Sequence, residues 1–297
     1  MYSFSDIVIF YIACAAGRDI QKISMESGVL GVTSIDDELF VLLHRDDKQV
    51  PVYSVNDYQL LRYLNLPGFK PDLYSDMTSC VRHKCLYMSN FNNRCIHRYE
   101  LGSKFGAKLR RVVRGGSRIS KWPVSDKPCC LSVTPSCNLL VTCRCQDEPS
   151  KLVELSADSG QCVREIALSD TADPWHGVQL TTGQFVVCHG VLGSLHRVCL
   201  VGDDGKVTRS YGGEYGCDVG QLDWPCHLAV DEHSQFIFVA DRRNSRVVLL
   251  SPTLHIVRYV TEELSGPRRL YLHQPTRRLI VGRYGEWGGG DVTVIRL

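Results

Sequence analysis

Histidine and cysteine side chains that could bind a metal stand at comparable places in the sequence. His227 and Cys130 each precede a leucine within an apolar stretch, and His176 lies close to the same place in a third stretch. Imidazole nitrogens and thiolates are ligands that zinc prefers in proteins. A further stretch carries Arg268-Arg269 at this level, and guanidinium groups would repel a cation. We therefore predict no bound metal and no cofactor, and keep His227, Cys130 and His176 as the candidates if a metal is present.

Other catalytic constellations are incomplete. The chain has no Gly-x-Ser-x-Gly motif, with which many hydrolases expose a serine nucleophile. Glycines such as Gly115-Gly116 read as loop residues, because no helical pattern follows them as in a phosphate-binding turn. Asp76 and Asn90 carry oxygen ligands that calcium accepts, but the sequence offers no complete set around them. The chain is accordingly predicted not to be an enzyme.

A repeat of four strands must position these residues. Short stretches rich in Val, Ile, Leu, Phe and Tyr alternate with Gly, Pro, Asn and Asp turns, and no long segment has a helical period. The clearest unit runs from Trp224 to Tyr259 and contains four such stretches. Anchors of the first stretch recur at intervals of 42 to 53 residues, at Val32, Thr78, Leu131, Val178, Leu228 and Leu270. Six repeats predict an all-β fold, a six-bladed β-propeller with four-stranded antiparallel blades.

The two ends of the chain can complete one blade together. The last unit stops after a third strand, Asp291 to Leu297, and Arg18 to Ile23 can supply the fourth. We predict that this N-terminal strand closes the ring and that residues 18–297 form a single propeller. Residues 1–17 are a leader or an extra strand. Ala13-Cys14-Ala15 resembles a signal-peptidase site, but no Lys or Arg precedes the apolar run 7–16, which is too short to span a bilayer.

Composition adds few constraints. A formal net charge of +2 gives no reason to expect attraction of the whole molecule to a membrane or to nucleic acid. The 14 cysteines include no Cys-x-x-Cys pair, and most lie in apolar stretches, so buried reduced thiols are predicted rather than a disulfide scaffold. We expect a cytoplasmic monomer that does not contact a membrane.

Three consecutive motifs distinguish the fifth unit. Pro225 to Asp231 reads PCHLAVD, Phe236 to Asp241 reads FIFVAD, and Arg242 to Val247 reads RRNSRV. Together they resemble the NHL repeat, whose pattern is roughly P-x-G-I-A-V-D, I-Y-V-A-D and R-x-N-x-R-I, with His227 in place of the glycine. Leu86 to Arg94 is a weaker echo, and the other units match only in layout.

The resemblance implies a recognition module. NHL propellers are best known as the C-terminal domains of tripartite-motif ubiquitin ligases, which implies a non-catalytic protein-recognition role in ubiquitination, here without that family's RING and B-box cysteines. Two alternatives stay open. Some NHL propellers resemble RNA readers with a basic, aromatic face. Related lyase and lactonase propellers hold metals, although His227 lies one place later than the lyase ligand position.

Strand direction assigns the loops to two faces. In a four-stranded antiparallel blade, the loop into the first strand and the turn between the second and third strands lie at the same end. Tryptophan and arginine, which often anchor binding hot spots, gather at this end. The candidate binding residues are Trp287, Trp175, Trp224, Trp122, Arg242, Arg243, Arg283, Tyr284 and Arg268.

We predict that a protein partner, whose identity the sequence does not reveal, docks on this face. Trp122 and Trp224 precede prolines, so packing between blades is the alternative role for these two. RNA is the second hypothesis for the ligand. It ranks after a protein because acids such as Asp241 and Glu286 reduce the positive charge of the same face.

Overall fold

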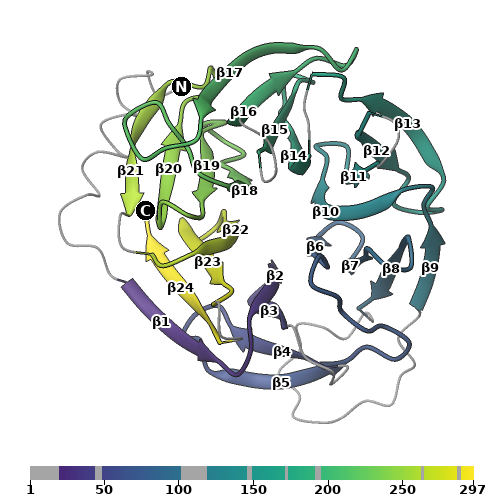
Figure 1. Cartoon of the computed structure of the whole chain (residues 1–297). Helices are drawn as coiled ribbons and strands as arrows, with labels where there is room; N and C mark the ends of the chain where they lie inside the picture. Colours follow the sequence, from purple (N-terminus) through teal and green to yellow (C-terminus); the bar gives the residue numbers. More distant parts are fainter. Residues whose placement is uncertain are drawn as a thin grey trace.

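The chain forms a ring of six blades around a central axis (Figure 1). The computed structural model describes residues 20–43, 49–101, 119–145, 149–170, 173–190, 195–261, 264–285 and 289–297. These residues form 24 β-strands and no helix, and each blade is a four-stranded antiparallel sheet. The predicted all-β fold, the number of blades and their strand order are confirmed.

The blades follow one another along the chain. Blade one contains β2 (Val29–Ile35), β3 (Glu38–Leu43), β4 (Gln49–Ser54) and β5 (Leu60–Asn65). Blade two contains β6 (Met77–Cys80), β7 (Cys85–Asn90), β8 (Cys95–Glu100) and β9 (Ile119–Pro123). Blade three contains β10 (Lys127–Val133), β11 (Leu139–Arg144), β12 (Lys151–Leu155) and β13 (Cys162–Ala167).

The second half of the ring repeats this order. Blade four contains β14 (Pro174–Gln179), β15 (Phe185–His189), β16 (Leu195–Val201) and β17 (Val207–Glu214). Blade five contains β18 (Pro225–Val230), β19 (Ile237–Asp241), β20 (Arg246–Leu250) and β21 (Ile256–Thr261). Blade six contains β22 (Pro267–His273), β23 (Arg278–Arg283), β24 (Gly290–Arg296) and β1 (Ile20–Met25).

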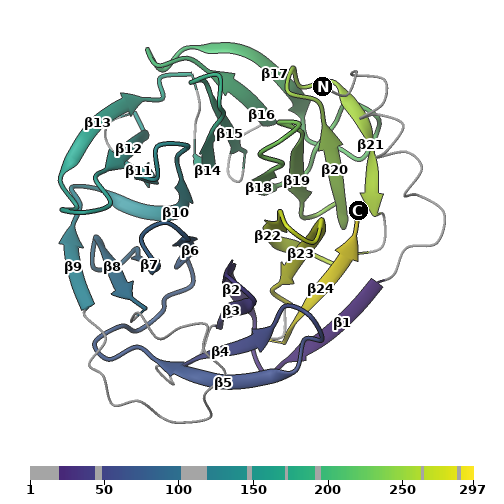
Figure 2. The same ribbon diagram turned by 180° about the vertical axis from the view of Figure 1, so that it is seen from behind.

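The N-terminal strand closes the ring, as predicted. β1 pairs antiparallel with β24 in an unbroken register from Ile20 opposite Ile295 to Met25 opposite Gly290. Figure 2 shows this strand on the outside of blade six, which otherwise ends with the C-terminus. The strand lies about two residues later than the expected range, whose Arg18 is outside the described residues. Pairing satisfies the backbone groups that an open edge at β24 would leave unpaired.

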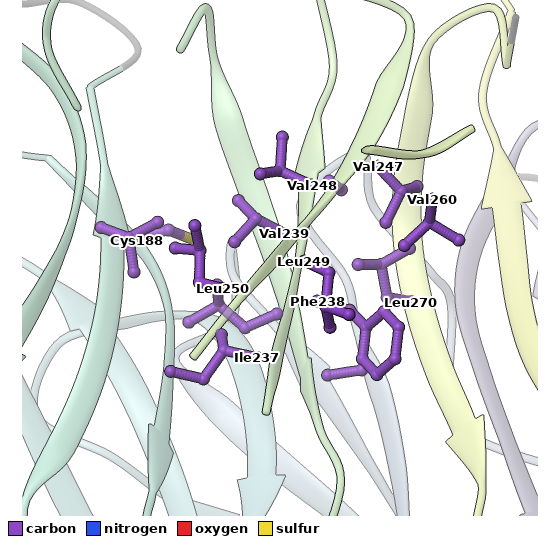
Figure 3. Packing of buried hydrophobic residues seen from close by; sticks show 14 of the residues in the cluster. Cys188, Ile237, Phe238, Val239, Val247, Val248, Leu249, Leu250, Val260 and Leu270 are labelled. Atoms are coloured by element: carbon purple, nitrogen blue, oxygen red, sulfur yellow. The ribbon is translucent and has the colours of Figure 1, made fainter. Parts of the chain in front are cut away.

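Burial follows distance from the axis. The first strands are buried almost throughout, as in β2, because each lies near the axis between two neighbouring blades. The fourth strands are largely exposed; in β13 only Ile166 is buried. Figure 3 shows one of the resulting cores, in which Cys188 of blade four and Leu270 of blade six pack on either side of Phe238 and its neighbours in blade five. Apolar contact between blades therefore holds the ring together.

Cysteines contribute to these cores as thiols. Every cysteine in the described part of the chain is free, and most are buried, as expected for thiols that pack in the core. Within the same residues, no helix has the length and apolar character needed to cross a membrane.

Candidate functional site

Six equivalent positions surround the axis, one in each blade. They lie near the beginning of the first strand and pair with the second strand at Leu42, Ser89, Thr142, Cys188, Ala240 and Gly282. In all blades except the second, a bulge directly precedes the position, and a bulge redirects the side chain that follows it. We call this set the inner ring: Gly31, Asp76, Cys130, His176, His227 and Arg269.

The inner ring confirms part of the sequence reasoning and corrects another part. Cys130 and His227 are equivalent, as expected, and His176 occupies the same level. The anchors chosen in blades two and four were wrong by one residue: the structural equivalents of Leu228 are Met77 and Gly177, not Thr78 and Val178. The difference hid Asp76, which belongs to the ring.

Polar side chains of the inner ring join neighbouring blades. The Nδ1 atom of His176 accepts the N–H of Leu228 at 3.1 Å, and Nδ1 of His227 accepts the N–H of Leu270 at 3.3 Å. A carboxylate oxygen of Asp76 accepts the N–H of Leu131 at 2.9 Å. In each case the side chain accepts the hydrogen bond of a buried backbone amide in the next blade. These amides are therefore satisfied without a water molecule.

A buried ion pair completes the ring. Nε of Arg269 lies 3.0 Å from Oδ1 of Asp76, and both side chains are 1% exposed. Burial alone would raise the pKa of Asp76, but the charge of Arg269 and the contact with His227 hold that pKa well below its usual range. Arg269 also donates to the carbonyl oxygens of Leu30 and Ser75, at 2.5 and 3.2 Å.

The two ring histidines are stacked and neutral. Their ring centroids are 3.9 Å apart and their planes differ by 12°. Burial lowers the pKa of both imidazoles, and the neighbouring His227 lowers that of His176 further. Since Nδ1 of each ring accepts an amide N–H, the hydrogen bonds assign the proton to Nε2. Nε2–H of His176 donates to the Leu131 carbonyl oxygen at 3.1 Å.

This donor set does not fit a metal ion well. One potential ligand atom each of Asp76, Cys130 and His227 lies within 4.8 Å of the others. However, Nε2 of His227 carries a proton, and burial raises the pKa of the Cys130 thiol well above its ordinary value. Arg269 already neutralises Asp76. Both nitrogens of His176 are hydrogen-bonded to backbone groups. The side chains of the inner ring therefore favour a structural network over a cation site.

Above the inner ring lies the predicted binding face, which we call the mouth face: the loops into the first strands and the turns between second and third strands. Residues of the loop before β6 reach across it. The Leu73 carbonyl oxygen accepts from Arg268 of blade six, and the Tyr74 ring lies 6.0 Å from that of Trp175 in blade four. This loop therefore contacts two blades that are not adjacent to blade two.

Two of the four candidate tryptophans are buried, and Trp122 takes its alternative role of packing between blades. Trp122 is 8% exposed and lies in β9 rather than in a loop; it packs 5.7 Å from Tyr87 and directly against Gly160, where a Cβ atom would overlap the indole. Trp175 is 4% exposed, because the bulge in β14 turns it towards Tyr74 and Trp224. Trp287 lies outside the described residues.

Trp224, Arg242 and Arg243 do come together on the mouth face. Both guanidinium groups lie over the indole of Trp224, at 4.5 Å for Arg242 and 4.8 Å for Arg243. Arg243 is exposed, whereas Trp224 and Arg242 are half-buried. Trp224 has a φ of 60°, which is rare for a bulky residue and is held here by bonds to His196 and Arg242.

The remaining candidates lie in blade six. Arg268 is 4% exposed and stacks 4.7 Å above the Tyr284 ring. Arg283 is paired with Asp291, so its charge is neutralised. Sequence reasoning missed Tyr74 and Phe91, whose rings are 4.6 Å apart and extend the aromatic surface into blade two; no repeat motif marks them.

Comparison with known proteins supports the fold. No protein-family model and no curated protein sequence matches the chain. Among solved structures, a luciferin-regenerating enzyme shares 12% identity over 95% of this chain and 96% of its own, with a TM-score of 0.67. A streptogramin B lyase shares 12% identity over 94% and 87%, with a TM-score of 0.61.

A third similar structure is a catalytically inactive virginiamycin B lyase from Staphylococcus aureus with quinupristin. It shares 10% identity over 95% of this chain and all of its own, with a TM-score of 0.61. At such low identity these likenesses show the six-bladed propeller fold alone.

Proposed function

We propose that this propeller is a non-catalytic recognition module of the NHL type that binds a protein partner through its mouth face. The observation that carries the proposal is the cluster of Trp224, Arg242 and Arg243, in which two guanidinium groups stack on one indole. Tryptophan and arginine are enriched at the centres of protein interfaces. The strained backbone of Trp224 adds support, because such strain concentrates at functional positions.

The inner ring also supports a non-catalytic role. Each of its acid and histidine side chains bonds to a backbone group, Asp76 pairs with Arg269, and Nε2 of His227 lies 3.7 Å from Asp76. These contacts support a structural role for the inner ring. The NHL-like motifs of blade five support a substrate-recognition role in ubiquitination. We propose a cytoplasmic monomer for this role.

Affinity purification from native cells tests the proposal. The wild type and the Trp224→Ala variant would be used as baits, each with and without ribonuclease and a chelator. We expect a partner protein that the wild type retains after both treatments and that the variant loses. Loss of the partner on ribonuclease treatment would contradict protein recognition and support RNA binding.

A metal-dependent enzyme is the second candidate, favoured by the similarity in fold to two lyases and a luciferin-regenerating enzyme and by the proximity of Asp76, Cys130 and His227. Metal analysis of the purified protein separates the two proposals. One ion per chain that disappears in His227→Ala would contradict the non-catalytic role.

A further inference from the structure

Arg268 is a buried cation with no carboxylate partner among the described residues. Its side chain is 4% exposed, and its bonds within the described residues are a donation to the Leu73 carbonyl oxygen and a stack on Tyr284. The nearby carboxylate, Asp76, is already paired with Arg269. Taking a charge out of water without an opposite charge is unfavourable, so the position calls for an anion.

Arg242 increases this excess of positive charge. Its guanidinium lies over Trp224, and no carboxylate pairs with it in the part of the chain that the structure describes. Burial, Arg269 and Arg242 together lower the pKa of Arg268 to about 9, so these guanidinium groups act on one another. Of these three arginines from blades five and six, only Arg269 pairs with a carboxylate in the described part of the chain.

The same place has an excess of hydrogen-bond donors. The Nε1 atoms of Trp175 and Trp224 are buried, and neither has an acceptor among the described residues. The two indoles lie 6.1 Å apart, and Trp175 is itself 4% exposed. Buried donors are normally satisfied. Two unsatisfied indoles, together with guanidinium groups that have no carboxylate among the described residues, indicate a ligand that supplies acceptors and negative charge.

Resting on the proposed recognition function, we propose that Arg268 and Arg242, with the indoles of Trp175 and Trp224, bind a carboxylate side chain of an acidic peptide segment in the protein partner. Guanidinium and carboxylate groups match in shape and form paired, charge-assisted hydrogen bonds. The surrounding rings of Trp224 and Tyr284 suit the apolar part of such a segment.

The charges of the mouth face favour a single carboxylate over a nucleic-acid backbone. Three other arginines there are paired with carboxylates: Arg144 with Asp173, Arg243 with Asp223, and Arg283 with Asp291. Asp126, in the loop before β10, adds further negative charge and pairs with Lys151. A chain of phosphates would need a long series of unpaired cations, whereas Arg268 and Arg242 together suffice for one carboxylate.

Binding of a labelled peptide tests the site. The probe is a fluorescein-labelled ten-residue peptide of alternating Glu and Leu, compared with its Gln–Leu counterpart and with a ten-nucleotide oligouridine RNA. We expect the Glu peptide to bind the wild type at least tenfold more tightly than the Gln peptide. Arg268→Met and Arg242→Met should each weaken binding of the Glu peptide at least tenfold, while Arg82→Met, at an exposed arginine on the opposite face, should not.

The melting temperature provides a second readout. Arg268→Met should be folded and should melt at or above the wild-type temperature without ligand, because it removes an uncompensated charge. Equal binding of Glu and Gln peptides, unchanged binding in both arginine variants, or binding of the RNA instead of the Glu peptide would overturn the carboxylate site. If a native partner still requires Trp224 in those cases, recognition through the mouth face stands and only the carboxylate site fails.

Discussion

At the scale of single residues, the hydrogen bonds of the inner ring explain why polar side chains occur in the most buried strands of the propeller. Asp76, His176 and His227 accept amide hydrogens of the following blades, and Arg269 neutralises the acid. A buried network of this kind is stabilising only while it is complete. Its members should therefore be strongly coupled in their effect on folding.

The Asp76–Arg269 pair allows that coupling to be measured. Asp76→Leu should lower the free energy of unfolding by about 3–5 kcal/mol, because it leaves the guanidinium buried without its carboxylate. Adding Arg269→Met should recover most of the loss, since the double variant buries no charge at this position. Urea denaturation of the two single variants and the double variant measures the coupling; additive losses would contradict the ion-pair assignment.

The histidines predict how stability depends on pH. Burial lowers the pKa of His97, His176, His227 and His273 below the ordinary value of 6.5. As pH falls below 6.5, the unfolded chain therefore binds protons that the native state does not, and the free energy of unfolding decreases. The stability that these groups contribute is present above that pH.

Urea denaturation between pH 7 and pH 5 checks this dependence. His176→Asn should reduce the loss of stability on acidification, because the amide oxygen can accept the Leu228 N–H in place of Nδ1 but does not titrate. A slope of equal size in this variant would mean that His176 is not held neutral.

The sequence placed four ring members at one level, namely Cys130, His176, His227 and Arg269, but not the whole ring. Cys130 and His227 each precede a leucine, so the repeat aligned them correctly, whereas blades two and four offer Met77 and Gly177 at that place. Neither looks like the β-branched or leucine anchor of a buried strand, so the anchors were placed one residue late. Asp76 and its partner Arg269 meet only through the ring, a contact between distant residues that no local pattern contains.

At the scale of strands, the closing strand and the outer strands differ in how well the sequence marks them. β1 was predictable, because blade six lacked a fourth strand that only the N-terminus could supply. β9 was not: its place in the repeat assigned Trp122 to the loop into blade three, yet the residue lies in an outer strand that ends on Pro123, which has no amide hydrogen to donate. Trp122 consequently became a packing residue rather than an anchor.

Removal of β1 should weaken the whole ring. A chain that begins at residue 26 loses every pair between β1 and β24, exposes an open edge and should lose several kcal/mol of stability, with aggregation as a consequence. A chain that begins at residue 20 retains all of those pairs, so it is the control. Equal melting temperatures of the two truncated chains would contradict a stabilising role for this strand.

At the scale of the whole molecule, the two ends of the axis have different characters. The mouth face carries the stacked Trp224, Arg242 and Arg243 and the buried Arg268. The opposite face presents short turns such as that at Gly205, where a positive φ requires glycine. The six-bladed ring was predictable from the repeat alone. Which face binds a partner depends on how side chains from separate blades pair, and the sequence does not contain that information in a local form.

The most direct measurement of the central claim is the affinity of the captured partner for variants of the two faces. The double variant Arg242→Ala/Arg243→Ala should weaken binding at least tenfold, because loss of a true anchor costs about 2 kcal/mol or more. Its melting temperature should stay near that of the wild type. Arg82→Ala and Asp203→Ala, at exposed positions on the opposite face, should leave the affinity unchanged. Loss of binding in these two variants, with retention in the arginine pair, would contradict recognition through the mouth face.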